Sequence, residues 1–230
     1  MQHFSIAAIL EAGPFLLKGL IFSLELTVVA FAGGLLLGIG LALVRHLKVP
    51  VASQIAAGYI TLIRSIPLIM VLFWFFFLMP LVLMWATGAP RPVQIGPVWT
   101  AFVTFTMFEA AYYAEIIRAG LKSIATGQYA ASKALGMSTW QMYRLIVLPQ
   151  VLRVVSPILL TQTVILFQDT SLVYVLSLTD LLGAASKVAQ RDGRLVEMYL
   201  TVALVFIVVC SVASHFVAVL KQRYAVPARR

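Results

Sequence analysis

The sequence predicts an all-α integral membrane protein with about five transmembrane helices. Of its 230 residues, 62% are hydrophobic and only 11% are charged, and the mean hydropathy is +1.00. A soluble domain carries roughly 25% charged residues, and a soluble core of this length could not bury so much apolar surface. The apolar residues also form runs of about 20 or more that are apolar on every face, whereas the strands of a membrane barrel alternate over about 10 residues. A self-contained soluble enzyme is therefore excluded.

Five apolar runs are each long enough to cross a bilayer as a helix, which takes about 20 residues. They cover residues 20–44, 55–83, 98–117, 151–178 and 195–220, within one membrane domain of residues 19–221. An amino-terminal segment, 1–18, precedes them and a tail, 222–230, follows them. The first run is longer than the apolar part of a signal peptide and has no basic segment before it beyond Lys18, so we expect it to be retained.

Positively charged residues predict the orientation of the chain. If the segments after the first, third and fifth spans face the cytoplasm, eleven basic residues lie on that side and five on the other, with Arg64 unassigned. The cytoplasmic set is Arg45, Lys48, Arg118, Lys122, Lys133, Arg144, Arg153, Lys221, Arg223, Arg229 and Arg230; the outer set is Lys18, Arg91, Lys187, Arg191 and Arg194. Because basic residues favour the cytoplasmic side, we expect the amino terminus outside and the carboxyl terminus inside. The net charge of +9 is then mostly a topology signal, so we expect membrane lipid, and no nucleic acid, as a partner.

Residues 118–150 form the longest segment expected in the cytoplasm, and they contain four basic residues and no acid. Good helix formers over 130–135 predict a short helix, which Gly136 is placed to end in a left-handed turn. A second short helix is expected over 140–146, stopped before Pro149. Such a helix–turn–helix knob fits the groove of another protein. From the residues alone, a basic loop lying on the lipid headgroups explains the segment equally well.

Three acids lie within or beside the apolar runs, where a charge at mid-bilayer costs at least about 2.5 kcal/mol. Glu115 precedes Arg118 by three residues, so we expect an ion pair between them at the cytoplasmic boundary. Glu109 is expected near mid-depth and Asp169 toward the outer side. Because buried charges in membranes usually face a partner or a cavity, the sequence favours a translocation path or a subunit interface for these two.

The spacing of residues within 118–150 resembles the EAA loop of bacterial ABC importer permeases. It reads Ala130-Ala131-Ser132, three residues, Gly136, nine residues, Ile146-Val147-Leu148-Pro149. The glutamate of that loop is absent, since Ala130 stands in its place, and Ser132 replaces the last alanine. The resemblance implies that the segment docks onto a cytoplasmic ATPase. The residues it assigns to this coupling are Gly127, Ala130, Ala131, Ser132, Gly136, Ile146, Leu148 and Pro149.

Three further motifs resemble signatures of the polar amino-acid permeases within this family. Arg64-Ser65-Ile66-Pro67-Leu68 resembles their Arg-Gly-Thr-Pro-Leu motif, residues 111–120 resemble their third-span signature, and residues 169–172 resemble their fourth. The longer stretch 167–178 is similar to permeases that import glutamate and aspartate. Four motifs in order extend over nearly the whole chain, which is on this basis identified as a member of the family.

Membership implies a type I ABC importer transmembrane domain in a bacterial inner membrane. The implied partners are a second permease subunit, either a copy or a paralogue, two cytoplasmic ATPase subunits and a periplasmic substrate-binding protein. The chain has no Gly-x-x-x-x-Gly-Lys-[Ser/Thr] loop to cradle ATP phosphates, so ATP and magnesium are expected on the partner ATPase. We expect no enzyme activity and no bound cofactor in this chain. The dispersed residues His3, His46 and His215 show no metal-ligand spacing.

The implied function is ATP-driven import of polar amino acids, most specifically glutamate or aspartate, by alternating access. The candidate translocation path consists of Arg64, Ser65, Glu109, Asp169, Thr170 and Ser171. Asp169 suits the substrate ammonium and Arg64 a carboxylate, but Asp169 could also pin its span to a neighbouring subunit. The hydroxyls of Thr170 and Ser171 could equally bond back to their own helix. The alternative function is an amino-acid carrier driven by an ion gradient, for which inverted repeats are expected and none is visible.

Overall fold

The computed structural model describes residues 4–224, and every regular element within them is helical. The elements are α1 (Ile6–His46), α2 (Ala52–Arg64), α3 (Leu68–Phe73), η1 (Trp74–Leu78), α4 (Met79–Thr87), α5 (Pro97–Ser123), α6 (Thr126–Ala134), α7 (Thr139–Met142), η2 (Tyr143–Val147), α8 (Leu148–Asp169), η3 (Thr170–Leu176), α9 (Leu181–Asp192) and α10 (Leu195–Tyr224). The turns of η1 and η2 are wider than those of an α-helix, and those of η3 are tighter. Residues 1–3 of the predicted amino-terminal segment and 225–230 of the predicted tail lie outside the described residues.

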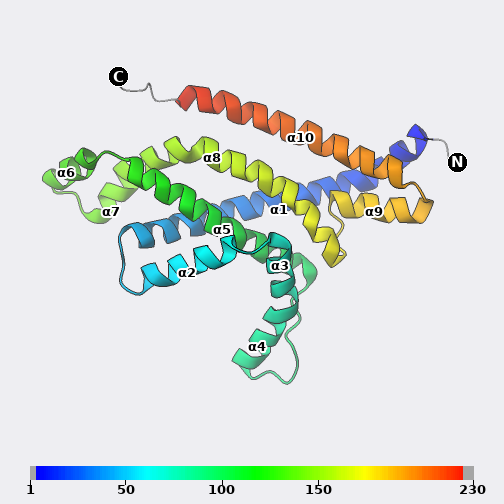
Figure 1. Cartoon of the computed structure of the whole chain (residues 1–230), viewed down its shortest axis with the longest axis horizontal. Helices are drawn as coiled ribbons and strands as arrows, with labels where there is room; N and C mark the ends of the chain where they lie inside the picture. Colours follow the sequence, from blue (N-terminus) through cyan, green and yellow to red (C-terminus); the bar gives the residue numbers. More distant parts are fainter. Residues whose placement is uncertain (1–3, 225–230) are drawn as a thin grey trace.

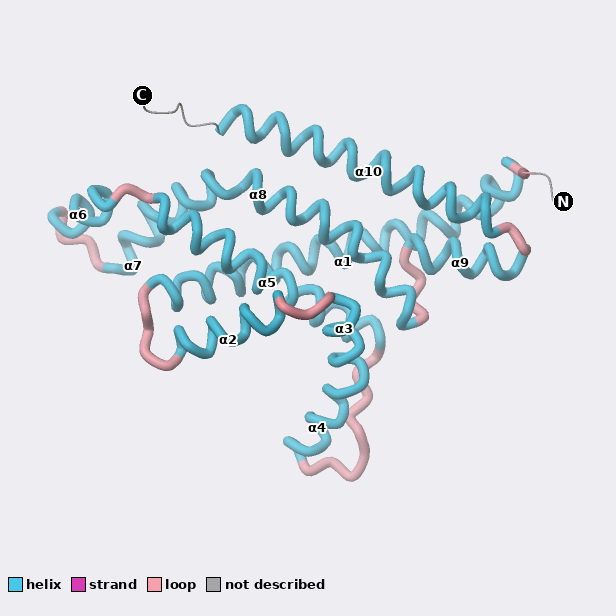
Figure 2. Tube along the Cα trace, in the orientation of Figure 1, coloured by secondary structure: helices cyan, strands magenta, loops and turns pink. Residues whose placement is uncertain are grey.

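Four long helices, α1, α5, α8 and α10, form a bundle along the long axis of the molecule (Figure 1). α1 packs along α5, α5 packs on α8, and α8 packs on α10. The helices α6 and α7 lie at one end of this bundle, where the chain also turns from α1 into α2, and α9 lies at the other end against α1 and α10 (Figure 2). The start of α1 and the last turn of α10 therefore lie toward opposite ends of the bundle (Figure 1).

The contact between α1 and α5 depends on small residues. Ala30, Gly34 and Gly38 lie at four-residue spacing on the buried face of α1. A Cβ atom at Gly34 would lie 3.0 Å from the Cβ of Glu109, and one at Gly38 would lie 2.9 Å from the Cβ of Tyr113. Lipid is as apolar as the helices themselves, so helices in membranes associate largely through such close packing of backbones over small residues.

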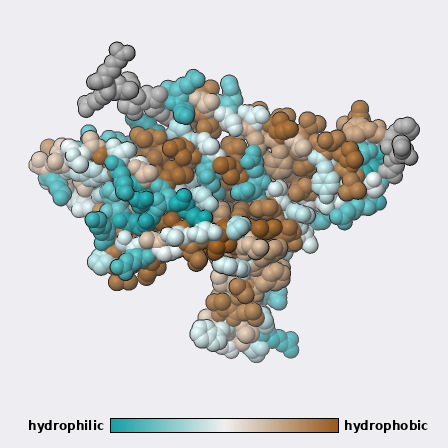
Figure 3. Space-filling view, viewed as in Figure 1, coloured by the Kyte–Doolittle hydropathy of each residue, from teal (hydrophilic) through white to brown (hydrophobic). Residues whose placement is uncertain are grey.

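Four helical stretches are long and apolar enough to cross a membrane: Ile6–His46, Leu68–Thr87, Thr139–Leu176 and Leu195–Gln222. The third predicted span, 98–117, lies in α5, which has 27 residues but is not among these four. α5 packs against α1, α2, α3 and α8, and polar residues of membrane proteins usually face such a bundle interior. Its low hydropathy is therefore consistent with its central place. Apolar side chains dominate the middle of the visible face, and hydrophilic ones gather toward the α6 end (Figure 3).

The second predicted span, 55–83, is not one continuous helix. α2 ends at Arg64 and α3 begins at Leu68, after a bend at residues 65–67. Pro67 has no N–H group to donate and disfavours helical geometry at the residue before it, so the chain turns here. The helical stretch Leu68–Thr87 then leaves the bundle as an arm (Figure 1), and its segments η1 and α4 contain no buried residue.

Two other predicted boundaries are corrected by the structure. Residues 6–18 belong to α1 and not to a separate segment, because Ser5 caps the helix by accepting a backbone N–H of its first turn at 3.4 Å. Pro149 does not stop the second loop helix, since the chain stays helical from Thr139 to Leu176. The wide turn η2 ends two residues before Pro149, and η1 ends two residues before Pro80. A wider turn shifts the carbonyl that would clash with the proline ring, so the helix continues past it.

The helix α9 lies outside the five predicted spans and closes the end of the bundle opposite α6. Asp180 begins it by accepting the N–H groups of Leu182 and Gly183 at 3.0 and 3.1 Å. Gly193, at φ +69°, ends it. The buried face of α9 packs against the start of α1 and against α10. The three helices share one buried apolar cluster, which consists of Ala12, Leu16, Leu181, Ala184, Ala185, Val188, Ala189, Met198 and Val202. α9 thus holds the first and last long helices together.

Candidate coupling surface and translocation path

The coupling loop, residues 118–150, contains two short helices joined by a sharp turn. Gly136 has a φ of +73°, the left-handed conformation that glycine adopts without strain. Ser138 Oγ accepts the N–H of Gln141 at 3.2 Å, and Gln141 Oε1 accepts the N–H of Ser138 at 2.9 Å. This reciprocal pair is a capping box that begins α7. A glycine turn and a cap together define the path of the loop between α6 and α7.

The surface of the coupling loop presents large apolar side chains. Leu135 is 80% exposed, Trp140 65% and Leu145 59%. Of the predicted coupling residues, Gly127, Ala130, Ala131, Gly136 and Pro149 are exposed, Ile146 and Leu148 are half-buried, and Ser132 is buried with its hydroxyl donating to the Gln128 carbonyl at 2.8 Å. Exposed apolar residues gathered in one place usually mark an interaction surface. Sequence reasoning did not single out Leu135, Trp140 or Leu145 as part of it.

Aromatic residues anchor the coupling loop to the end of the bundle. The ring of His46, the last residue of α1, lies 6.4 Å from that of Tyr129 in α6 and 6.0 Å from that of Tyr143 in η2. The Tyr129 hydroxyl donates to the Leu121 carbonyl at 3.2 Å. Tyr143 is buried in a cluster that includes residues of α1, α5 and α8. The coupling loop is therefore in direct contact with the ends of these long helices.

An ion-pair network lies where α1 and α5 end. Arg118 Nη2 donates to Glu115 Oε2 at 2.5 Å, and Arg118 Nε lies 3.1 Å from the same oxygen. Arg45 also donates to Glu115. Sequence reasoning did not find Arg45, which is 70 residues away, although both residues close predicted spans at the same membrane boundary. Glu115 thus joins α1 to α5 as well as bonding within α5.

Glu109 lies inside the bundle, in the middle of α5. It is 1% exposed, and its Oε1 accepts the side-chain N–H of Gln162 at 3.3 Å, while its Oε2 has no hydrogen-bond partner among the described residues. One turn further along α5, the Tyr113 hydroxyl lies 3.1 Å from Thr163 Oγ1. Because the Thr163 hydroxyl donates to the Leu159 carbonyl, Tyr113 is the donor in that pair. Sequence reasoning found Glu109 but not the α8 residues Gln162 and Thr163, which no local pattern distinguishes.

Asp169 ends α8 and is half-buried, and its carboxylate forms no ion pair with the side chains described, those of residues 4–222. The hydroxyls of the next two residues both donate hydrogen bonds to backbone carbonyls of this chain. Thr170 donates to the Phe167 carbonyl at 2.7 Å and Ser171 donates to the Gln168 carbonyl at 2.9 Å. Of the two alternatives for these hydroxyls, the structure has the bond back to the helix.

Arg64 lies at the end of α2, about 18 Å along the axis from the start of that helix at 1.5 Å per residue. Its guanidinium carbon lies 5.2 Å from the ring centre of Tyr112, a cation–π contact, and its side chain is otherwise exposed. The Ser65 hydroxyl donates to the Thr61 carbonyl at 2.6 Å. Arg64 lies in the second predicted span, and a guanidinium within a membrane usually faces a polar cavity or a partner. The structure does not bring Arg64 and Asp169 together as an ion pair within the part of the chain that it describes.

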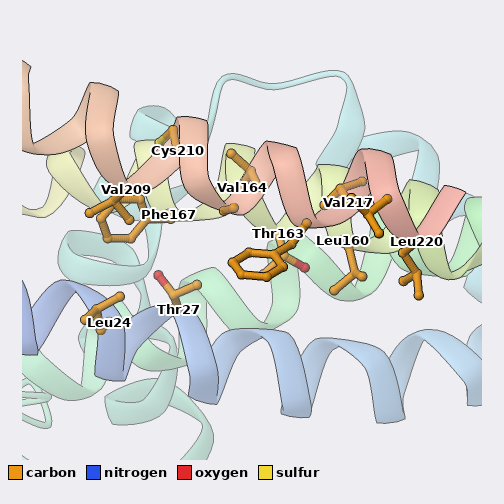
Figure 4. Close-up of a pocket in the computed structure, with 13 residues that line it drawn as sticks. Leu24, Thr27, Leu160, Thr163, Val164, Phe167, Val209, Cys210, Val217 and Leu220 are labelled. Carbon is orange, nitrogen blue, oxygen red and sulfur yellow. The ribbon is translucent and has the colours of Figure 1, made fainter. Parts of the chain in front are cut away.

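A cavity of about 530 Å³ lies between α1, α8 and α10 (Figure 4). Its lining is almost entirely apolar, with Leu160, Val164 and Phe167 from α8 facing Val209 and Val217 from α10 (Figure 4). The hydroxyl hydrogens of the two lining threonines, Thr27 and Thr163, are donated to carbonyls of their own helices. With no charged group in its wall, the cavity does not suit a charged amino acid. Among the described residues, no group of three or more His, Cys, Asp or Glu side chains could hold a metal ion.

A bundle of membrane-length helices with buried acids and a helix–turn–helix at one end is the arrangement expected of the transmembrane subunit of a transporter. The family model for the inner membrane component of binding-protein-dependent transport systems matches residues 34–226. The glutamate/aspartate import permease protein GltK of Escherichia coli O6:H1 (strain CFT073) is 46% identical over 98% of this chain and 100% of its own length. The probable amino-acid ABC transporter permease protein YckA of Bacillus subtilis (strain 168) is 30% identical over 94% of this chain and 92% of its own length. A chain in the crystal structure of an amino acid ABC transporter with histidines superposes with a TM-score of 0.83 at 25% identity, covering 96% of this chain and 100% of that chain.

This chain belongs to the family of binding-protein-dependent transport system inner membrane components. It is a permease subunit of an ABC importer with the type I transmembrane fold, it is a multi-pass protein of the inner membrane, and it is not an enzyme. The predicted family and the predicted fold class are thereby confirmed.

Proposed function

We propose that this permease subunit imports glutamate and aspartate. The observation that carries the proposal is the 46% identity to a glutamate/aspartate import permease over essentially the full length of both chains. The amino terminus lies outside and the carboxyl terminus in the cytoplasm, in keeping with the eleven basic residues on the side of the coupling loop against five on the other.

The coupling loop docks onto a cytoplasmic ATPase. Its exposed apolar residues Leu135, Trp140 and Leu145 support a protein groove as the partner better than lipid headgroups do. Two ATPases, a second permease subunit and a periplasmic binding protein complete the importer. ATP and magnesium bind the ATPases, since this chain has no phosphate-binding loop. Closure of the ATPases moves the loop, and the contacts of Tyr129 and Tyr143 with His46 carry the movement into the bundle.

The translocation path runs past Arg64, Glu109 and Asp169. Arg64 attracts a substrate carboxylate, because the planar guanidinium suits bidentate contact, and Asp169 attracts the ammonium. Glu109 is 1% exposed and has a carboxylate oxygen without a hydrogen-bond partner among the described residues. Such a buried group calls for a polar partner, and Glu109 reaches the path when the bundle opens beside it.

Uptake of labelled amino acid into proteoliposomes tests the substrate. Labelled glutamate should accumulate only when this chain, its partner permease, the ATPase, ATP and the binding protein are all present, and unlabelled aspartate should compete. Import of arginine or histidine without competition by acidic amino acids would overturn the substrate assignment. Uptake that continues without ATP and collapses with an ionophore would instead support an ion-gradient-driven carrier.

Asp169→Asn tests the path. The substitution keeps the size of the side chain and its hydrogen bonding but removes the charge, so the complex should assemble with normal basal ATPase activity while glutamate uptake falls at least about tenfold, the effect of losing one strong charge contact. Asp192→Asn is the control, since Asp192 is paired with Arg191 at the far end of α9. Unaltered apparent affinity and rate for Asp169→Asn would remove it from the path, and poor assembly would assign it to a subunit contact.

A further inference from the structure

A second cavity, of about 540 Å³, lies at the end of the bundle beside the coupling loop, and most of its lining is basic. It is lined by Arg45, His46, Lys48, Ser53, Gln54, Ala57, Arg118 and Lys122. We call it the cationic pocket. Its walls come from the last turn of α1, the turn into α2, the first turns of α2 and the end of α5. Figure 3 shows hydrophilic residues gathered toward this end of the molecule.

The positive charge of the cationic pocket is only partly compensated. Arg45 and Arg118 share the single carboxylate of Glu115. Lys48 and Lys122 take part in no ion pair within residues 4–224. Four cationic side chains therefore converge on one cavity against one carboxylate. Like charges held together repel each other, and a bound anion relieves this repulsion.

The surroundings of the cationic pocket indicate where the anion comes from. Its residues end the first and third predicted spans and precede the second, so the pocket lies at the membrane boundary, where lipid phosphates are found. Beside Lys48 the α1–α2 turn exposes Leu47, Val49 and Val51, and α2 exposes Ile55, with 67% of the Val51 and Ile55 side chains accessible. A free anion from water would leave this apolar rim exposed, whereas the acyl chains of a lipid would cover it.

We propose that the cationic pocket binds the phosphate of an anionic phospholipid from the leaflet on the side of the coupling loop. Lys48 and Lys122 contact the phosphate, Arg45 supplies the N–H groups that Glu115 does not use, and Ser53 and Gln54 bond to the polar part of the headgroup. The acyl chains lie along Val51 and Ile55. Clustered basic residues at the cytoplasmic end of membrane helices are suited to this chemistry.

The bound lipid has a consequence for the coupling loop. His46 lines the cationic pocket and its ring contacts those of Tyr129 and Tyr143. A headgroup in the pocket holds the ends of α1, α2 and α5 together directly beside these contacts. The lipid therefore fixes the base on which the coupling loop moves, whichever amino acid is carried.

The test compares two double variants of the full chain, purified with its co-purifying subunits and stripped of lipid. Lys48→Gln with Lys122→Gln removes the two unpaired charges of the pocket. Arg153→Gln with Lys221→Gln removes two exposed charges of the same side outside it. Binding of phosphatidylglycerol and of phosphatidylcholine is titrated by native mass spectrometry. The unmodified chain and the control should bind one phosphatidylglycerol at least about tenfold more tightly than phosphatidylcholine, and the pocket variant should lose this preference.

Four further results test this assignment. Lys48→Arg with Lys122→Arg keeps the charge and should retain the preference, which separates lost binding from lost folding. Equal loss of the preference in the pocket variant and in the control would overturn the site, since the effect would then be general surface charge. Full displacement of phosphatidylglycerol by inorganic phosphate would assign the pocket to a free anion, and loss of the ATPase from the pocket variant with unchanged lipid binding would assign it to a protein partner. Either of these outcomes overturns the proposal.

Discussion

A single glycine shows how little room the helix contacts leave. At Gly38 an added Cβ would lie 2.9 Å from the Cβ of Tyr113 and 3.1 and 3.2 Å from backbone atoms of Ala114 and Ala110. None of these atoms is the end of a flexible side chain, so a larger residue forces α1 and α5 apart. At Gly40, two residues on, an added Cβ meets nothing within 4 Å.

We therefore expect Gly38→Leu to destabilise the protein by about 1–3 kcal/mol, the usual cost of overpacking. The stability of Gly40→Leu should remain close to that of the unmodified protein. Leucine is also the better helix former, by up to about 1 kcal/mol, and this acts equally in both variants. Thermal unfolding of the two purified proteins in the same detergent measures the difference. Equal melting temperatures would show that α1 and α5 do not depend on this close approach.

The coupling loop, as an element, depends on the left-handed turn between α6 and α7. Gly136→Val places a β-branched side chain at a φ of +73°, which such residues strongly disfavour. An added Cβ meets no atom within 4 Å, so the effect is confined to the backbone of the turn. We expect membrane insertion to survive while glutamate uptake and co-purification of the ATPase fall several-fold. Gly136→Asn, which tolerates this conformation, should stay near normal, and equal uptake by both variants would exclude the turn from coupling.

The helix α9 depends on its N-terminal cap, Asp180. Burial raises the pKa of Asp180 to about 6, although the N–H groups of Gly183 and Leu182 favour its carboxylate. A raised pKa means that the folded state holds its proton more firmly than the unfolded state, so this contribution to stability is complete below about pH 4 and is lost as the pH rises through 6. Asp180→Asn keeps an amide cap and cannot titrate. The melting temperature of the unmodified protein should therefore fall relative to that of Asp180→Asn between pH 4 and pH 7, and parallel curves would contradict this account.

The elements also show which features a sequence can predict. Hydropathy identified the long helices, and local residue chemistry identified the turn at Gly136, because each signal lies within one continuous stretch of the chain. The cap at Asp180 and the glycine at the end of α9 are local signals as well, and α9 could have been found from them. Arg45 joins Glu115 across 70 residues, and Gln162 reaches Glu109 across 53. Contacts of this kind depend on how the helices pack and cannot be predicted from neighbouring residues in the chain.

For the whole molecule, hydropathy reports the surroundings of a helix more than its importance to the fold. The arm Leu68–Thr87 is among the most apolar stretches, with a mean hydropathy of 2.5, yet most of it lies away from the bundle. α5 packs against α1, α2, α3, η1 and α8, carries Glu109 and Glu115, and is not apolar enough to be counted among the candidate spans. In a transporter the central helix is expected to be less apolar than the peripheral ones, since the helix that lines the interior must carry polar groups.

The orientation of the whole molecule in the membrane can be tested, because the molecule has two distinct ends. The coupling loop lies at one end of the bundle and α9 at the other (Figure 1), and the residues that line the cationic pocket are at the end of the coupling loop. If the excess of basic residues fixes the first end in the cytoplasm, then Lys133 in α6 is inside and Arg191 in α9 is outside. Both side chains are exposed, so each can carry a chemical label.

Cys210 is the only cysteine of the sequence, so Cys210→Ser provides a background without thiols. In that background Arg191→Cys should react with a membrane-impermeant maleimide in intact spheroplasts, because the reagent reaches only the outer face. Lys133→Cys should react only after the membrane is made permeable, and Lys48→Cys in the lining of the cationic pocket should behave in the same way. Labelling of Lys133→Cys in intact spheroplasts, with Arg191→Cys protected, would reverse the orientation. The coupling loop would then be out of reach of any cytoplasmic ATPase, and the lipid site would lie in the opposite leaflet.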